Sequence, residues 1–158
     1  MPTQSTTHQQ TEVIGHKKLP VNAGAECVWL KMRDFTDLSW ALGIAEVIVE
    51  GSDVGMVRRV RLEGSEEWLE EKLLDLDDDD RRIEYGIAEG MMGINDYRAC
   101  AQVIPNDTGC FVEWTCSGRA TAADQAEKQQ ILMAVAEGIT TLFAASLQKI
   151  YRFRVRSR

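Results

Sequence analysis

Four polar side chains in the middle of the chain have types and spacings that suit acid–base chemistry inside an apolar pocket: Arg58, Glu71, Tyr85 and Tyr97. Arg58 alternates with apolar residues at period two, which places it among them on one face of a strand. Burying an unpaired guanidinium is very unfavourable, so Arg58 must meet a carboxylate or an anionic ligand group. Glu71 lies on the apolar face of the next strand-like run. We therefore predict that Glu71 pairs with Arg58.

Two kinds of role are open to this pair. It could orient a polar group of a ligand, or one member could transfer a proton. It could equally be an ion pair that satisfies only itself, because such networks are often structural. Tyr85 and Tyr97 also fall in inward-facing rows. Their hydroxyls could donate to a carbonyl and stabilise enolate character, or they could be satisfied locally while the rings pack.

The apolar residues around these four side chains predict the lining of a cavity. Ala99 and Ala101 share the row of Tyr97, and their small size leaves volume beside bulkier neighbours. Trp40 is expected to close the mouth and Trp114 to point inward, although core or lid packing explains both without a ligand. The residues predicted to contact a ligand are Trp40, Met56, Leu69, Ile87, Ala99, Trp114, Ile139 and Phe143.

The elements that must position these residues are predicted from hydrophobic periodicity and turn formers. A first strand spans 11–20, Asn22 is the predicted N-cap of a short helix, and a second short helix covers 35–38. Six strand-like runs follow, and their short, turn-rich connections imply antiparallel neighbours. These runs cover 44–50, 54–62, 67–75, 82–89, 96–104 and 110–118.

Beyond Ala120 the apolar residues recur at spacings of three and four, which predicts one long helix with Asp124 as its N-cap. Its apolar face is wide enough to cover a sheet, and an antiparallel sheet with one apolar face needs such a cover. The predicted fold class is α+β: a curved, seven-stranded antiparallel sheet wrapped around a long C-terminal helix, with two short helices between the first two strands.

Several local motifs occur in a characteristic order along this pattern. They are Trp29, Asp34-Phe35 followed by Leu38 and Trp40, Val54-Gly55-Met56-Val57-Arg58, Glu71-Lys72-Leu73-Leu74, Arg82-Ile83-Glu84-Tyr85 and Val112-Glu113-Trp114. In this order the chain resembles the SRPBCC superfamily, the helix-grip fold of START-type lipid-transfer domains and bacterial polyketide cyclases/dehydrases. The Trp-Xaa-Pro often seen in that superfamily is replaced here by Trp40-Ala41-Leu42. The resemblance implies a ligand cavity between the sheet and the C-terminal helix.

The domain organisation follows from length and composition. We expect a disordered leader over 1–10, one ligand-binding domain over 11–150 and a basic tail over 151–158 that continues the last helix. The tail either complements the carbonyls at the helix end or contacts an anionic partner or membrane. The net charge of -7 argues against a nucleic-acid partner. No run approaches the roughly 18 uninterrupted apolar residues of a membrane span, so we expect a cytoplasmic chain without integral membrane contact.

No metal or redox cofactor is expected. The four cysteines form no CxxC pair, and the acidic run Asp77–Asp80 lacks the glycine and the downstream glutamate of a calcium loop. That run is predicted to be a solvated hairpin turn. His8 falls in the predicted leader and His16 shares its strand face with a lysine, so neither suggests a catalytic triad.

Three functions remain open at this point. The chain could bind a polyketide-like, aromatic or lipid-like molecule in an internal cavity and assist its cyclisation or dehydration through Arg58, Glu71, Tyr85 and Tyr97. It could carry such a molecule without changing it. A protein-interaction module would instead have a filled interior and no pocket. Both a monomer and a homodimer are compatible with the sequence.

Overall fold

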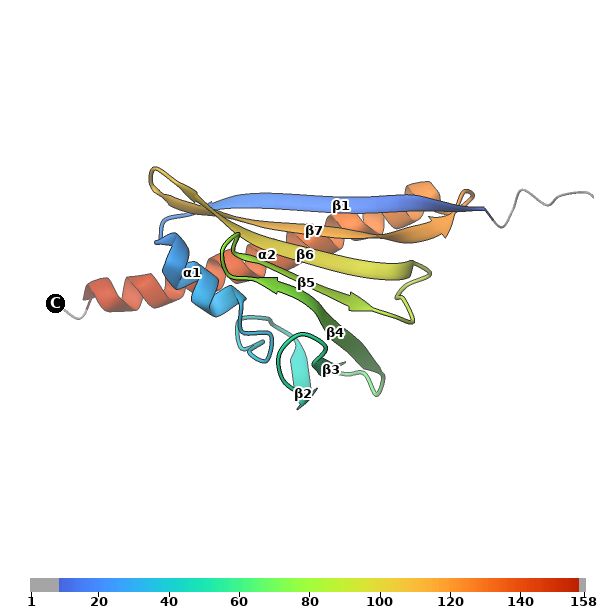
Figure 1. The fold of residues 1–158 in the computed structure, drawn as a ribbon, viewed down its shortest axis with the longest axis horizontal. Helices are drawn as coiled ribbons and strands as arrows, with labels where there is room; N and C mark the ends of the chain where they lie inside the picture. Colours follow the sequence, from blue (N-terminus) through green and yellow to red (C-terminus); the bar gives the residue numbers. More distant parts are fainter. Residues whose placement is uncertain (1–8, 157–158) are drawn as a thin grey trace, which may run out of the picture.

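The computed structural model describes residues 9–156, with side chains up to Leu147. The predicted leader therefore falls largely outside the described residues, as do the side chains of the predicted basic tail. Seven strands and two helices follow one another along the chain (Figure 1). They are β1 (Gln10–Val21), α1 (Ala25–Met32), β2 (Ile44–Glu50), β3 (Val57–Leu62), β4 (Trp68–Asp77), β5 (Arg82–Ile87), β6 (Asn95–Asn106), β7 (Gly109–Thr121) and α2 (Gln125–Arg156).

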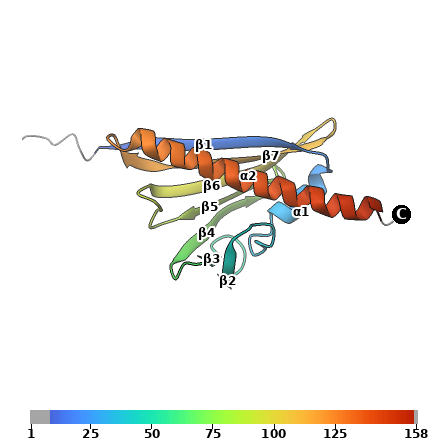
Figure 2. The same ribbon diagram turned by 180° about the vertical axis from the view of Figure 1, so that it is seen from behind.

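All seven strands belong to one antiparallel sheet, in the order β1-β7-β6-β5-β4-β3-β2. The short connections between consecutive strands make β2 to β7 a meander, and β1 closes the sheet by pairing with β7 along its whole length. Helix α2 lies behind the sheet in Figure 1 and in front of it in Figure 2. The predicted fold class, a seven-stranded antiparallel sheet with one long C-terminal helix, is confirmed.

Helix α2 covers one side of the sheet unevenly, because it packs mainly on β1 and β7 (Figure 2). Leu132, Ala136 and Phe143 on its inner face are fully buried, as the helical period predicts. Within Gln125–Leu147 the most apolar stretch of 18 residues has a mean hydropathy of 1.5, so by length and composition alone this helix could cross a membrane. One third of its most apolar stretch is buried against the rest of the chain.

The second short helix predicted over 35–38 is wrong, since the structure has turns there. The reason is local: Asp34 accepts a hydrogen bond from the backbone N–H of Thr36, and Asp37 accepts one from the backbone N–H of Ser39. Such bonds compete with helical hydrogen bonding and favour turns. The predicted cap is wrong as well, because α1 has Gly24 at its N-cap rather than Asn22, with no side-chain hydrogen bond.

Strand β3 begins three residues later than predicted, at Val57 instead of Val54. Asp53 and Gly55 have φ angles of 58° and 100°, so the chain turns through the left-handed region immediately before the strand. Val54 consequently lies in the turn, with 54% of its surface exposed. The remaining strands deviate from their predicted ranges only at the ends.

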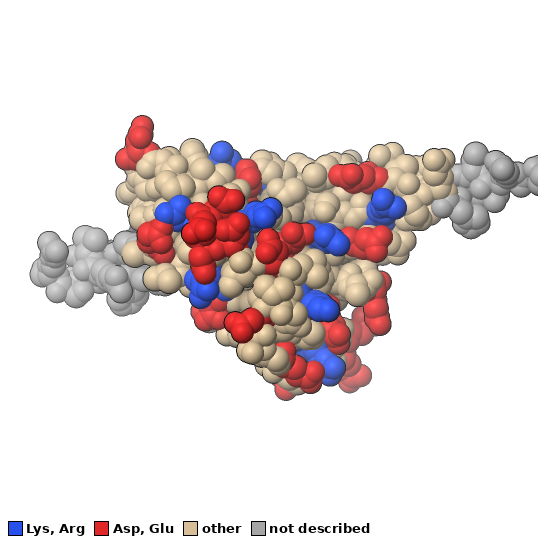
Figure 3. Space-filling view, in the orientation of Figure 1, with Lys and Arg blue, Asp and Glu red and all other residues tan. Residues whose placement is uncertain are grey.

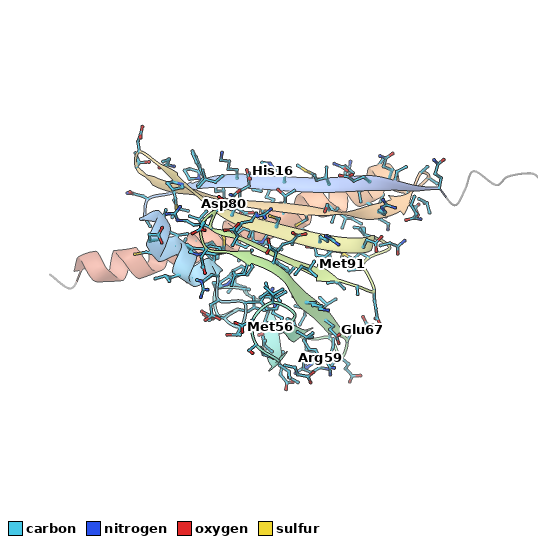
Figure 4. All side chains as sticks on the ribbon, viewed as in Figure 1. His16, Met56, Arg59, Glu67, Asp80 and Met91 are labelled. Carbon is cyan, nitrogen blue, oxygen red and sulfur yellow. The ribbon has the colours of Figure 1, made fainter. Side chains whose placement is uncertain are left out.

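The acidic run forms the tip of the hairpin between β4 and β5, as predicted. Asp77 accepts hydrogen bonds from the backbone N–H groups of Asp79 and Asp80. Asp78 accepts one from Trp29 Nε1, which ties the turn to α1. Figure 4 labels Asp80 near α1, and the acidic atoms of Figure 3 are densest in the same place.

Gly15 lets α2 approach the sheet, and this contact generates a stability prediction. A Cβ atom at Gly15 would collide with the backbone of Leu132, whereas one at Gly138 on the exposed side of α2 would meet nothing within 4 Å. We expect Gly15→Ala to lower the free energy of unfolding by about 2–3 kcal/mol because the helix must shift. Gly138→Ala, the matched control, should raise it by about 0.5–1 kcal/mol. Chemical denaturation of both variants checks this, and equal effects would contradict the close approach.

Candidate functional site

The site is organised around Arg58, which the sheet register sets directly opposite Glu71. The two residues are cross-strand partners on β3 and β4, and Arg58 Nη2 donates to Glu71 Oε2 at 3.0 Å. Only 5% of the Arg58 surface is exposed, and the Glu71 side chain is 14% exposed. The predicted ion pair is therefore confirmed as a buried pair on the apolar inner face.

The rest of the Arg58 guanidinium is held by the segment between α1 and β2. Arg58 Nη1 donates to the carbonyl oxygen of Phe35 at 2.8 Å. The guanidinium carbon lies 4.0 Å from the centre of the Phe35 ring and 5.0 Å from that of Tyr85, within the range of cation–π contacts. Arg58 Nε has no hydrogen-bond partner among the described residues. The Nε–H group of this buried guanidinium therefore remains without an acceptor.

The Tyr85 hydroxyl is a second donor without an acceptor, in the same space as the Arg58 guanidinium. Its hydroxyl oxygen accepts a hydrogen bond from Trp114 Nε1 at 3.2 Å, and its own proton has no acceptor among the described residues. Burial, and after it the charge of Glu71, holds the pKa of Tyr85 well above its ordinary value. The hydroxyl therefore stays protonated, and available as a donor, at every physiological pH.

The space that Arg58 and Tyr85 share is small. It measures about 20 Å³ and is bounded further by Trp40, Trp114 and Phe35. A site of this size holds about one water molecule, since a water needs roughly 10–15 Å³ of such volume. This space is much smaller than the cavity predicted from the sequence.

Aromatic rings occupy the volume that the alanines were expected to leave. Ala99 is the cross-strand partner of Tyr85, and Ala101 is the partner of Trp114. Both alanines have no exposed surface, so the large residues beside them close the space. The volume left by small residues on one strand is filled by large residues on the neighbouring strands. The pattern of a single strand does not reveal this.

Trp40 joins this layer from the segment before β2. Its ring centre lies 5.9 Å from that of Trp114 and 5.2 Å from that of Phe143 on α2. Trp114 and Phe143 are buried, as expected for inward-facing residues, while Trp40 stays partly exposed. Trp40 thus lies at the boundary between this aromatic layer and solvent, where a mouth was predicted.

Tyr97 does not share the space beside Arg58. Its hydroxyl donates to Cys116 Sγ at 3.4 Å, and the tyrosine is 4% exposed. Burial, followed by the nearby Tyr85, raises the pKa of Tyr97 well above its ordinary value. In this structure its hydroxyl is satisfied locally, which was the alternative to the donor role predicted for it.

The remaining predicted ligand residues are spread over different parts of the fold. Met56 lines another cleft, of about 280 Å³, which shares Asp34 and Phe35 with the space beside Arg58. Leu69 and Ile87 line another cleft of about 590 Å³. Ile139 is partly buried against the core. Sequence reasoning missed Phe35 as a site residue, although the Asp34-Phe35 motif that supported the family resemblance contains it.

Within the described residues, no group of three or more histidine, cysteine, aspartate or glutamate side chains could hold a metal ion. His16 instead pairs with Glu113 at 2.8 Å on the outer face of the sheet (Figure 4). Arg58, Glu71 and Tyr85 can offer hydrogen bonds and electrostatic stabilisation to a bound molecule.

Comparisons with known proteins agree with this architecture. A family model described as "Polyketide cyclase / dehydrase and lipid transport" matches residues 16–152. A search of the curated proteins finds no match. Norcoclaurine synthase from Thalictrum flavum, solved in complex with dopamine and hydroxybenzaldehyde, is 16% identical with a TM-score of 0.73, covering 89% of this chain and 88% of that chain.

Two structural-genomics targets are also similar. The protein from Nitrosospira multiformis is 26% identical with a TM-score of 0.71, over 88% of this chain and 99% of that chain. The protein from Thermobifida fusca is 24% identical with a TM-score of 0.72, over 87% of this chain and 92% of that chain. The synthase and the Thermobifida protein share the fold with this chain, and at these identities nothing more follows from them. The helix-grip fold and the resemblance to the SRPBCC superfamily are confirmed.

The buried pair predicts unequal effects for two neighbouring glutamates. Glu71→Gln leaves the buried guanidinium without its counter-charge, and we expect it to lower the free energy of unfolding by about 3 kcal/mol. Glu70 pairs with Arg59 at 3.2 Å on the exposed face of the same two strands. Glu70→Gln should therefore cost less than about 1 kcal/mol. Urea denaturation of both variants measures the difference, and a similar small loss for both would show that Arg58 does not depend on Glu71.

Cys116 predicts a loss of stability at alkaline pH. Burial raises the pKa of this thiol from 9.0 to about 11. Between these values the unfolded chain releases the proton while the folded chain retains it, so the unfolding free energy falls as pH rises, by up to about 3 kcal/mol. Cys116→Ala should flatten this fall between pH 9 and 11, and the exposed Cys27 provides the control variant Cys27→Ala. Denaturation curves at each pH test this, and parallel profiles for all three proteins would contradict it.

Proposed function

We propose that this chain, which belongs to the family of polyketide cyclases, dehydrases and lipid-transport proteins, binds one small and largely apolar molecule against the inner face of its sheet. An oxygen of that molecule accepts hydrogen bonds from Arg58 Nε and Tyr85 Oη. The observation that carries the proposal is the unpartnered Arg58 Nε, because an unmade hydrogen bond at a buried donor costs about 1–3 kcal/mol. A ligand oxygen placed there recovers that cost.

The ligand reaches these donors only after aromatic side chains move, because the present space accommodates about one water. Trp40 is the side chain best placed to move. It is partly exposed and belongs to a segment of turns, whereas Trp114 and Phe143 are buried on β7 and α2. A ligand ring that replaces the Trp40 ring against Trp114 and Phe143 exchanges one aromatic contact for another.

A second candidate function is catalysis of a cyclisation or dehydration by the same groups. It is favoured by the two donors beside one space, since paired donors stabilise an oxygen more strongly as negative charge develops on it, as in an enolate. Asp34 and Asp37 line the space, whereas Glu71, the carboxylate predicted to act in proton transfer, is engaged by Arg58 at 3.0 Å. The carrier function needs only the binding step, and the binding proposal is common to both.

Tyr85→Phe and a matched pair of probes test the proposal. The ketone 2-acetylnaphthalene has an oxygen for the two donors, and 2-ethylnaphthalene has nearly the same shape without one. We expect the wild-type chain to bind the ketone about 3–10-fold more tightly, the usual value of one or two hydrogen bonds. In Tyr85→Phe, which removes only the hydroxyl, that preference should shrink while the affinity for 2-ethylnaphthalene stays the same.

The four tryptophan indole N–H signals in a ¹H,¹⁵N spectrum locate the probe. Binding on the inner face must shift the signals of Trp40 and Trp114, assigned through Trp40→Phe and Trp114→Phe. Equal affinity for both probes, or no shift at Trp40 and Trp114, would contradict the proposal. If the recovered ketone is chemically unchanged by mass, carriage is supported over turnover of this probe.

A further inference from the structure

The sheet splits between β4 and β5, at the end away from α1. Strand β4 pairs with β5 from Lys72 onward, opposite Gly86, so its first residues pair only with β3. Strand β5 ends at Ile87 and continues into a turn through Gly90. Figures 1 and 2 both show the beginning of β4 diverging from β5, and Figure 4 labels Glu67 and Met91 on opposite sides of the split.

The split contains a cleft of about 590 Å³, within the usual range of small-molecule sites. Its walls combine apolar and polar surface in similar amounts and come from both faces of the sheet. Leu69 and Ile87 belong to the inner rows, whereas Ile48 and Trp68 belong to the outer face. Trp68 is 39% exposed and Ile48 is 40% exposed, so two large apolar side chains are left facing solvent at this cleft.

A second groove continues from the cleft along the outer face. It measures about 690 Å³ and shares Ile87 and Ala88 with the cleft. Lys72 stands in its wall and forms no ion pair with any described residue. Two other basic residues nearby are neutralised, because Arg59 pairs with Glu70 and Arg98 pairs with Glu84. Arg119 also lines the groove without an ion pair to a described residue, and it stands opposite Glu12 of β1.

The charges fix which way a ligand would lie. Acidic and basic side chains alternate over this face, so no single strong field covers it (Figure 3). Glu89, at the turn end of the cleft, has no ion pair with a described residue and would repel an anion. Lys72, on the opposite side toward the groove, would attract one. An anionic head therefore belongs beside Lys72 and an apolar body between Trp68, Leu69 and Ile87.

We infer that the cleft between β4 and β5 is a second binding site, which takes a single-chain amphiphile with a carboxylate head. The apolar chain lies in the split of the sheet and the carboxylate lies at Lys72. This site is separate from the one beside Arg58, because no residue that bounds the Arg58 space also lines the cleft. It does not depend on the function proposed above.

Titration with decanoate, kept below its micelle concentration, tests the inference through the same indole signals. We expect a saturable shift of the Trp68 signal, identified by its absence in Trp68→Phe, with the Trp40 and Trp114 signals unmoved. Decan-1-ol should bind about 2–5-fold more weakly than decanoate, the usual value of one exposed ion pair. Decyltrimethylammonium should bind more weakly still.

Three variants complete the test. Ala88→Phe fills the cleft from an exposed position and should weaken decanoate binding at least 10-fold. Lys72→Gln should reduce the affinity for decanoate to that for decan-1-ol. The control variant Lys18→Gln removes an exposed lysine of β1 that lies over Phe111, and it should leave the affinities for decanoate and for decan-1-ol unchanged.

The inference would be overturned if decanoate produced no saturable shift at Trp68, or if Ala88→Phe bound decanoate as tightly as the wild-type chain. It would also be overturned if the cationic amphiphile bound more tightly than decanoate, or if decanoate shifted only the Trp40 and Trp114 signals. The last outcome would place the amphiphile on the inner face and leave the proposed function standing. Conversely, a Trp68 shift with decanoate and no response to 2-acetylnaphthalene would support this site and remove the first.

Discussion

A buried cation, Arg58, constrains the strands and loops that surround it. Arg58 lies in an apolar row with 5% of its surface exposed, and taking a charge out of water costs several kcal/mol unless it is paired and hydrogen-bonded. Glu71 supplies the counter-charge across the sheet, and the carbonyl of Phe35 satisfies a second nitrogen. The Phe35 and Tyr85 rings lie over the guanidinium. The strand register and the segment before β2 are thereby tied to the same side chain.

The aromatic layer around Arg58 explains how an apolar pocket and a well-packed core can occupy one place. The space between β7, α2 and the segment before β2 is filled by Trp40, Trp114 and Phe143. About 20 Å³ is left beside the two donors without acceptors, Arg58 Nε and the Tyr85 hydroxyl. Since proteins pack densely, a ligand here must replace protein atoms instead of entering a void. Binding then depends on the energy of moving Trp40 as much as on the hydrogen bonds.

The cleft between β4 and β5 follows from the way α2 covers only part of the sheet. Helix α2 packs on β1 and β7, and Gly15 allows its backbone to approach closely. Strands β2, β3 and the start of β4 lie at the far edge, where the pairing with β5 ends and the sheet opens. Apolar residues from both faces meet at that opening, so the cleft follows from the point where strand pairing stops.

The sequence alone determined the number and order of strands, the long helix, the inward rows and the pairing of Arg58 with Glu71. These depend on local periodicity and on the cost of an unpaired buried charge, which act on neighbouring residues. It did not determine the turns at Asp34 and Asp37, where side chains compete with the helix, or the loss of free volume beside Ala99 and Ala101. Packing around Arg58 and the split between β4 and β5 were decided only by tertiary structure, because both depend on how residues from separate strands and loops share one space.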